Sequence, residues 1–200
     1  MKFDPEKHHR RSIRLPDYNY AQAGAYFVTI CTYKKQCWFG DVKQGEIQLN
    51  QIGQIVVQEW LKSSEIRQEI ELDEWVLMPN HLHGIVWIKD QDQGRCDRIE
   101  DLHHEGLHHE GLHRKPLQSR SLGSFVNGFK SSVTRRVNLI RYNSDLPFWQ
   151  RNYYESIIRD ETHLRNIREY IWDNLQNWED DEEHPHNNSE WQKMLIDVRF

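Results

Sequence analysis

The chain has 200 residues, of which 37% are hydrophobic and 12% aromatic, so it can bury one well-formed core rather than two. No run approaches the ~18 consecutive apolar residues of a membrane span, and the three cysteines lack the spacing of a disulfide framework or a cysteine-rich zinc site. We therefore expect a cytoplasmic protein with no membrane partner. The net charge of −5 is uneven, because residues 114–141 carry seven Lys or Arg and no acid, whereas residues 179–183 are all acidic.

The first half of the chain predicts three strands and one helix. Residues 26–33 are rich in β-branched and aromatic side chains, which favours a strand. Asn50 is a good N-cap, and apolar residues recur at helical spacing to about residue 63, so a helix is expected there. Residues 70–78 and 81–88 predict two further strands, which are joined by a Pro-Asn pair and should lie side by side.

Residues 91–120 differ from the rest of the chain because they are polar and contain a five-residue repeat. The sequence Leu-His-His-Glu-Gly occupies residues 102–106 and 107–111. A five-residue period cannot keep one side of a helix apolar, so we expect a flexible loop inserted into the domain. Its histidines raise the hypothesis of a histidine-rich metal-handling protein that binds metal through residues 103–113.

The next segment predicts a basic helix followed by a fourth strand. Ser121 begins a helix with an inward apolar stripe, and Lys130, Arg135 and Arg136 are expected on its outer surface. Residues 153–158 contain enough aromatic and β-branched side chains to form a strand.

The last predicted element is a helix that begins after Asp160, a plausible N-cap. It buries an apolar stripe and carries Tyr170 and Asn174 together on its flank, because residues four apart are neighbours on a helix. Residues 176–200 are acidic, and we expect them to form a peripheral tail.

The predicted order is strand, helix, strand, strand, helix, strand, helix, which is typical of a split βαβ, ferredoxin-like fold. We expect an α+β protein with a central antiparallel sheet, helices on one side, and an additional C-terminal helix that carries Tyr170. The first and third strands lie centrally in that topology, so side chains of residues 81–88 would be held rigidly. The domain is assigned to residues 1–175, with the insert at 91–120 and the acidic tail at 176–200.

The strongest chemical signal is the pair His81 and His83, which would project from one face of a strand while Leu82 faces the core. Together with Tyr170 and Asn174, they would surround a divalent cation with two imidazole nitrogens and an amide oxygen, beside a phenol. Such ligands suit Mg²⁺ or Mn²⁺ bound with a substrate phosphate, and a zinc hydrolase is the competing hypothesis. Each residue also has an ordinary explanation, since histidines often pack in sheets and most helix tyrosines are core or rim aromatics.

Five ordered segments, which together span most of the chain, resemble the REP-associated tyrosine transposases. These proteins are members of the HUH single-strand endonucleases and relatives of the small insertion-sequence tyrosine transposases. The segments are YFVTICT at 26–32, MPNHLH at 78–83, GFKS at 128–131, FWQRNYYE at 148–155 and EYIWDN at 169–174.

The resemblance implies that His81, His83 and Asn174 hold the metal and that Tyr170 is the nucleophile. Its phenolate oxygen would attack a phosphate of single-stranded DNA near a hairpin, giving a covalent 5′-phosphotyrosine and a free 3′-hydroxyl. A free phenol has a pKa near ~10, so it is a poor nucleophile at pH 7 unless a cation or a base assists.

DNA is the expected partner, single-stranded or folded into a hairpin, and basic side chains should supply most of the affinity. The candidates lie on the amino-terminal arm, on the basic helix and in the fourth segment, where Trp149 is expected to stack on unpaired bases. These residues are Arg10, Arg11, Arg14, Lys130, Arg135, Arg136, Trp149 and Arg151.

The chain departs from the family pattern at Leu175, where a proline commonly follows the asparagine, and in the repeat insert. Neither departure removes a catalytic group. Tyr153 and Tyr154 are rival nucleophiles, although they look like strand residues. The acidic tail either occupies the basic face as a DNA mimic or is an ordinary solvated terminus.

The leading hypothesis is a metal-dependent enzyme that nicks and rejoins single-stranded DNA near hairpins, as a monomer or a homodimer. It would be cytoplasmic and bound to the nucleoid when it holds DNA. The alternatives are a non-catalytic remnant that binds DNA hairpins and the histidine-rich metal-handling protein.

Overall fold

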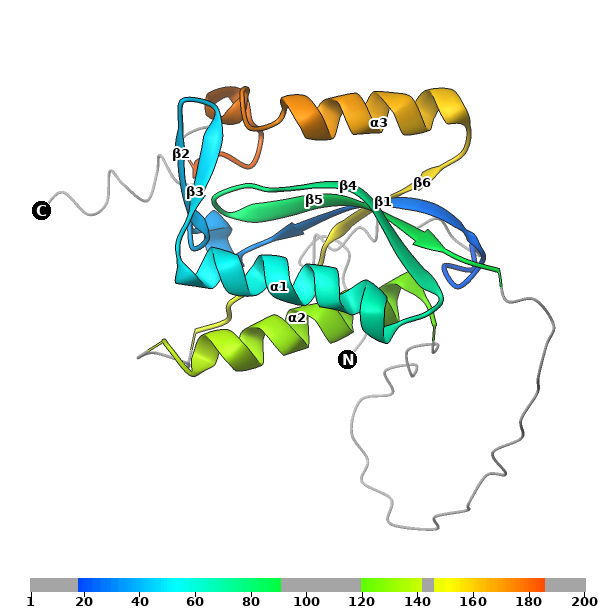
Figure 1. The fold of residues 1–200 in the computed structure, drawn as a ribbon, viewed down its shortest axis with the longest axis horizontal. Helices are drawn as coiled ribbons and strands as arrows, with labels where there is room; N and C mark the ends of the chain where they lie inside the picture. Colours follow the sequence, from blue (N-terminus) through cyan, green and yellow to red (C-terminus); the bar gives the residue numbers. More distant parts are fainter. Residues whose placement is uncertain (1–17, 91–119, 142–145, 186–200) are drawn as a thin grey trace, which may run out of the picture.

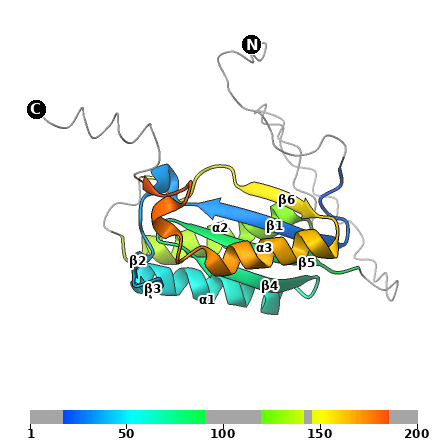
Figure 2. The same cartoon turned by 90° about the horizontal axis from the view of Figure 1, so that it is seen from above.

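A computed structural model describes residues 18–90, 120–141 and 146–185. Its main feature is a four-stranded antiparallel sheet. The strands are β1 (Gly24–Cys31), β4 (Ile70–Leu77), β5 (His81–Ile88) and β6 (Tyr154–Ile158). Their order in the sheet is β4-β5-β1-β6, so β1 and β5 are central, and Figure 2 shows β6 at one edge beside β1. This order confirms the ferredoxin-like topology.

The helices lie on both faces of this sheet. Helices α1 (Gln51–Ile66) and α2 (Leu122–Asn138) cover one face, and the additional helix α3 (Glu161–Asp173) lies on the other (Figure 1). The predicted α+β class, with two helices on one side and a further C-terminal helix, is therefore confirmed. No helix in the described part of the chain is long and apolar enough to span a membrane.

The two predicted N-caps, Asn50 and Asp160, act as caps, and so does Ser121, where a helix was predicted to begin. The Asn50 side chain accepts hydrogen bonds from the backbone N–H groups of the first turn of α1. The Ser121 hydroxyl accepts from Ser124 N in α2, and the Asp160 carboxylate accepts from His163 N in α3. These side chains satisfy backbone donors that have no partner within the helix, which explains why each helix begins where the sequence predicts.

A hairpin between β1 and α1 was not predicted. It pairs β2 (Gly40–Lys43) with β3 (Glu46–Leu49) in a separate two-stranded sheet. Its turn places both Gln44 and Gly45 at positive φ, the geometry of a tight hairpin turn. Glutamine rarely adopts this conformation, and strands of four residues are too short for a distinctive period, so the sequence carries a weak signal for the hairpin.

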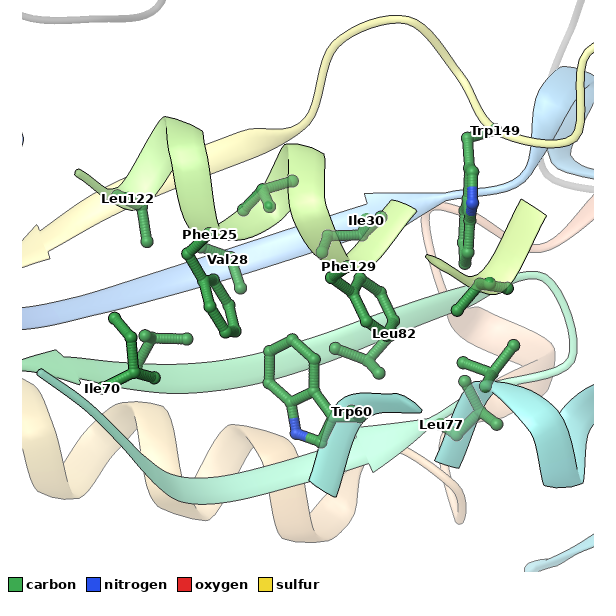
Figure 3. Packing of buried hydrophobic residues seen from close by; sticks show 14 of the residues in the cluster. Val28, Ile30, Trp60, Ile70, Leu77, Leu82, Leu122, Phe125, Phe129 and Trp149 are labelled. Carbon is green, nitrogen blue, oxygen red and sulfur yellow. The ribbon is translucent and has the colours of Figure 1, made fainter. Parts of the chain in front are cut away.

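The strand alternation divides the buried residues into two clusters. Tyr26, Val28 and Ile30 of β1 face α1 and α2, whereas Ala25 and Phe27 face α3. Figure 3 shows the first cluster around Trp60 of α1, with Phe125 and Phe129 of α2 beside the indole. The cluster on the α3 side of the sheet is smaller. This side also contains the residues of chemical interest.

A side chain at Gly84 should disturb the packing, because a Cβ atom at this position would approach Trp60 Cζ2 to 2.7 Å. We expect Gly84→Ala to lower the free energy of unfolding by about 1–3 kcal/mol through overpacking, as measured by urea denaturation. Gly128→Ala is the matched control, since its Cβ would meet only the end of the Arg67 side chain. In a helix that change should be neutral or stabilising by up to ~1 kcal/mol. Equal stability of both variants would contradict this account of the packing.

Candidate active site

Two buried histidines on the central strand β5 form the centre of the site. His81 and His83 are 0% and 3% exposed, and their side chains project to the α3 face, while Leu82 packs on the α1 and α2 face as predicted. The Nε2 atoms of the two imidazoles lie 2.9 Å apart. Two nitrogens that converge in this way share a proton or bind a cation between them.

Asn80 fixes the orientation of the first imidazole. Its Nδ2 donates to the carbonyl oxygens of Lys35 at 3.0 Å and of Glu183 at 2.7 Å, so its Oδ1 must face His81. His81 Nδ1 donates to that oxygen at 2.7 Å. The lone pair of a neutral His81 is therefore on Nε2, the atom that faces His83. Sequence reasoning treated Asn80 only as a turn residue.

Thr29 of β1 supports the second imidazole, because its Oγ1 lies 2.8 Å from His83 Nδ1. A hydroxyl both donates and accepts, so Thr29 permits either tautomer of His83. With the proton on Nε2, His83 donates to His81. With the proton on Nδ1, both Nε2 lone pairs point into the same space, which is the arrangement that a bound cation requires.

Burial keeps both imidazoles neutral. It lowers the pKa of His83 to about 3. It also lowers the pKa of His81 well below 6.5, with a further contribution from the neighbouring His83. Because neutral imidazole is the form that binds metals, the pair is ready to act as ligands at neutral pH.

Helix α3 brings Tyr170 to the histidines, as the sequence predicts. Tyr170 Oη lies 3.2 Å from His83 Nε2, and its ring meets the Phe27 ring edge-on at 6.0 Å. The side chain is 48% exposed, so a large substrate can reach the phenol. Asn174, the residue at the C-terminal end of α3, is 4% exposed, and its Oδ1 has no hydrogen-bond partner among the described residues. A buried oxygen of this kind is suited to bind a cation or to accept a hydrogen bond.

The rival tyrosines are placed less favourably. Tyr153 packs into the cluster on the opposite side of the sheet, beneath α1 and α2. Tyr154 shares the α3 face and is equally exposed, but its partner in the register is Thr29, and Thr29 in turn pairs with His83. A whole strand therefore separates Tyr154 from the histidines.

The surroundings of Tyr170 disfavour its ionisation. Burial raises the pKa of the phenol, and the carboxylates of Asp181, Glu182 and Glu183 raise it further, although a hydrogen bond with Asn174 opposes them. At neutral pH the phenol therefore keeps its proton, and its activation needs a positive charge nearby.

Asp181 is a potential ligand that sequence reasoning missed. Its Oδ2 lies 3.8 Å from His81 Nε2, and the ligand atoms of His81, His83 and Asp181 all lie within 4.8 Å of one another. Two imidazoles and a carboxylate suit Mn²⁺ and also Zn²⁺, while Mg²⁺ prefers oxygen ligands. The donor set and the orphaned oxygen of Asn174 therefore fit a divalent cation.

The acidic run at residues 179–183, which contains Asp181, packs against the rest of the domain. Lys35 Nζ contacts Glu183 Oε2 at 2.9 Å and donates to the Glu182 carbonyl at 3.1 Å. The buried Trp178 ring lies 6.1 Å from the His81 ring. Residues 176–185 of the predicted tail thus lie over the site rather than on α2, while residues 186–200 are outside the described part. The domain boundary at residue 175 stays a prediction.

The expected exposure of Lys130 and Trp149 is wrong. Lys130 is 8% exposed, and its Nζ donates to the carbonyls of Gln150 at 2.9 Å and Asn152 at 3.0 Å. Trp149 is 7% exposed, and its indole donates to the Lys130 carbonyl at 3.1 Å. Both side chains tie α2 to the loop before β6. Lys130 follows Val126 by four residues, so its place on the buried stripe was a signal for this role.

The remaining basic candidates differ in their surroundings. Arg136 Nη1 forms an ion pair with the buried Glu59 at 2.7 Å, and its Nη2 donates to Gln58 at 2.7 Å, which ties α2 to α1. Arg135 and Arg151 are exposed. The three arginines of the amino-terminal arm, Arg10, Arg11 and Arg14, lie outside the described residues, as does the repeat insert.

The fold and the site define an α+β protein with a histidine pair and a tyrosine on one face of its sheet. No family model matches the chain. An uncharacterized protein of Haemophilus influenzae is 43% identical over 187 residues, which are 90% of this chain and 96% of that protein. The chain therefore belongs to the family of this Haemophilus protein.

Two solved structures are similar to the chain. A REP-associated tyrosine transposase bound to a REP hairpin is 17% identical, with 83% of this chain and 74% of that chain covered and a TM-score of 0.54. A protein described as a transposase of Deinococcus radiodurans R1 is 16% identical, with 80% and 95% covered and a TM-score of 0.38. The first likeness shows that this chain has the fold of a REP-associated tyrosine transposase, which confirms the predicted resemblance for the fold.

The buried histidines predict a pH dependence of stability in metal-free protein. The unfolded chain takes up protons below pH 6.5, whereas folded His83 resists protonation until about pH 3. Stability is therefore lost as the pH falls through this window, by up to about 1.4 kcal/mol per pH unit for each buried histidine. Urea denaturation in EDTA between pH 7.5 and 4.5 measures this slope. We expect His83→Gln to reduce the slope by about the contribution of one histidine, and an unchanged slope would contradict the assignment.

Proposed function

We propose that this protein is a metal-dependent endonuclease and transposase that nicks and rejoins single-stranded DNA near hairpin sequences. The observation that carries the proposal is the contact between Tyr170 Oη and His83 Nε2 at 3.2 Å, in a site where a second imidazole nitrogen is 2.9 Å away. The phenol is a potential nucleophile, and the two neutral, buried imidazoles are potential cation ligands. All three groups are close enough to act on the same phosphate. The fold of a transposase that was solved with a REP hairpin supports the same class of substrate.

In the proposed reaction, Tyr170 Oη forms a bond with the phosphorus while the bond from phosphorus to the 3′ oxygen breaks. The phenol loses its proton, the 3′ oxygen takes one up and leaves as a 3′-hydroxyl, and the strand on the 3′ side of the nick remains attached through its 5′ phosphate as a phosphotyrosine. A divalent cation at the site would stabilise the phenolate and polarise the phosphate. The covalent bond retains the energy needed for rejoining, so a 3′-hydroxyl can reverse the reaction with another strand.

His81, His83 and Asp181 are the proposed metal ligands, with the Asn174 amide oxygen as a further one. Asn80 and Thr29 would hold the imidazoles in the ligand tautomers. The metal is proposed to be Mg²⁺ or Mn²⁺, and the two nitrogen ligands favour Mn²⁺.

The charges around Tyr170 support a requirement for the cation. A cavity of about 400 Å³ opens beside the phenol. Its lining residues are Tyr170, Asp173, Asn174, Asn177, Asp180, Asp181 and Glu182. A phosphate that enters this cavity meets several carboxylates, so without a cation the approach is electrostatically unfavourable. A bound divalent ion would reverse this balance next to the reacting atom.

The basic contacts to DNA are proposed to lie away from this acidic cavity. Arg135 on α2 and Arg151 before β6 are exposed and remain candidates, together with the amino-terminal arm. Arg136 would act mainly as a structural residue, because Glu59 and Gln58 occupy its guanidinium. The monomeric or dimeric state and the cytoplasmic location on the nucleoid stay predictions that depend on this function.

The direct test is the formation of a covalent adduct with labelled single-stranded hairpin DNA from the native genome in the presence of Mn²⁺. We expect the wild-type protein and Tyr154→Phe to form an adduct on a denaturing gel, whereas Tyr170→Phe forms none. Tyr154 is a suitable control because it lies on the same sheet face with the same exposure. His83→Ala should lose the adduct yet keep most of its hairpin affinity, since basic contacts supply that affinity. If hairpins bind tightly and no protein forms an adduct or a nick, the chain is a DNA-binding remnant.

Removal of the Asp181 charge should weaken metal binding. We expect Asp181→Asn to raise the Kd for Mn²⁺ by about tenfold or more, because ligand charge tunes cation affinity. Titration calorimetry or the spin-resonance signal of free Mn²⁺ measures this directly and without DNA. Glu179→Gln removes a charge from the same acidic run, but its side chain is 86% exposed, so it should change the Kd little. Equal effects of both variants would mean that only the general charge matters.

A further inference from the structure

Strand β4 contains a bulge beneath α3. The register of β4 against β5 shifts between Leu72 and Trp75, so Asp73 and Glu74 together lie opposite a single residue, Ile85. Leu72 and Trp75 both pack on the α1 and α2 side of the sheet. The extra residue therefore places two consecutive carboxylates at the other face, where α3 packs against β4.

The Asp73 carboxylate joins three elements at this bulge. Its Oδ1 accepts from Arg168 Nε at 3.0 Å and its Oδ2 accepts from Arg168 Nη2 at 2.7 Å, a two-point contact with α3. Oδ2 also accepts from the indole of Trp87 at 2.8 Å, and Oδ1 accepts from Glu74 N at 2.7 Å. Because Trp87 belongs to β5, one carboxylate connects the strand that carries the histidines to the helix that carries Tyr170.

The second carboxylate adds a contact one helical turn further on. The indole of Trp172 donates to Glu74 Oε2 at 2.9 Å. Arg168 and Trp172 are four residues apart on α3, so they lie on the same side of the helix and bracket Tyr170. The two contacts resist both a shift of the helix along its axis and a rotation about it.

The Asp73–Arg168 pair is charged at neutral pH. Burial acts to raise the pKa of Asp73, but hydrogen bonds from Arg168, Trp87 and the backbone of Glu74 outweigh it and hold the pKa below its usual value. A planar guanidinium that binds both carboxylate oxygens also has a fixed orientation, which a single contact would not give.

We propose that Asp73, supported by Glu74, is a positioning residue that holds α3 so that Tyr170 Oη stays at the histidine pair. The proposal rests on the proposed function, in which Tyr170 is the nucleophile. Neither carboxylate is a member of the histidine cluster, so their effect would pass through the helix alone. Displacement of a reacting atom by about 1 Å can slow a reaction about 100-fold, and apolar packing at Ile171 and Leu164 does not fix the helix as a two-point polar contact does.

The test compares Asp73→Asn with Glu71→Gln in the full-length protein. Glu71 lies on the same strand and forms its ion pair at 2.8 Å with Lys89, which is not part of α3, so its variant controls for the loss of a carboxylate. Three quantities are measured: the single-turnover rate of adduct formation with saturating hairpin and Mn²⁺, the Kd for the hairpin, and the Kd for Mn²⁺. We expect Asp73→Asn to slow adduct formation about 10- to 100-fold while both Kd values stay unchanged. Glu71→Gln should leave all three quantities unchanged.

A double-mutant cycle separates positioning from general damage to the fold. If the carboxylate acts through Arg168, then Asp73→Asn combined with Arg168→Gln should be no slower than either single variant. Additive losses, or an adduct rate in Asp73→Asn equal to that of the wild type, would overturn the proposal. So would an equal loss of rate, hairpin affinity and Mn²⁺ affinity, because that pattern indicates unfolding.

An independent measurement keeps this inference distinct from the proposed function. If the wild-type protein forms no adduct, the nuclease proposal fails. Amide hydrogen exchange then tests by itself whether Asp73 holds α3 on the sheet. Faster exchange along α3 in Asp73→Asn, with exchange in α1 and α2 unchanged, would support this role of Asp73, whereas unchanged exchange in α3 would refute it.

Discussion

The convergence of two buried imidazole nitrogens on the central strand is the constraint on which the rest of the site depends. Strand β5 presents an apolar face to α1 and α2 and a histidine face to α3, so the core that holds the strand also fixes the ligands. Asn80 and Thr29 then complete the hydrogen bonding of His81 and His83. With the His83 proton on Nδ1, the Nε2 lone pairs of both rings point to one place. Such a place could hold a cation.

The acidic run beside this pair gives the site its electrostatic character. Burial, and then the neighbouring carboxylates, raise the pKa of Tyr170, and carboxylates also line the cavity through which a phosphate would enter in the proposed function. These effects oppose the proposed attack of a phenolate on DNA, and a strong local positive charge would reverse both together. The same acids supply Asp181 to the histidine cluster. Negative charge at the site is therefore compatible with a DNA substrate once a divalent ion is included.

Several charged side chains that suggest DNA binding in the sequence hold the fold together. Lys130 satisfies two carbonyls of the loop before β6, and Arg136 binds the buried Glu59. Asp73 and Arg168 connect α3 to the sheet in the same manner. In a sheet with helices on both faces, such polar contacts fix the relative positions of elements that apolar packing alone would leave free to slide.

The sequence by itself determined the order of the elements of the main sheet and its helices, the caps Asn50 and Asp160, and the shared face of His81 and His83, because these depend on residues that are near one another in the chain. It also placed Tyr170 and Asn174 on one flank of the last helix. Only the tertiary structure revealed the contacts of Asp181, Asn80 and Asp73, whose partners lie far away along the chain or in other elements. Burial, pKa and ligand geometry depend on how strands and helices meet in space, and no local period of a sequence encodes those distances.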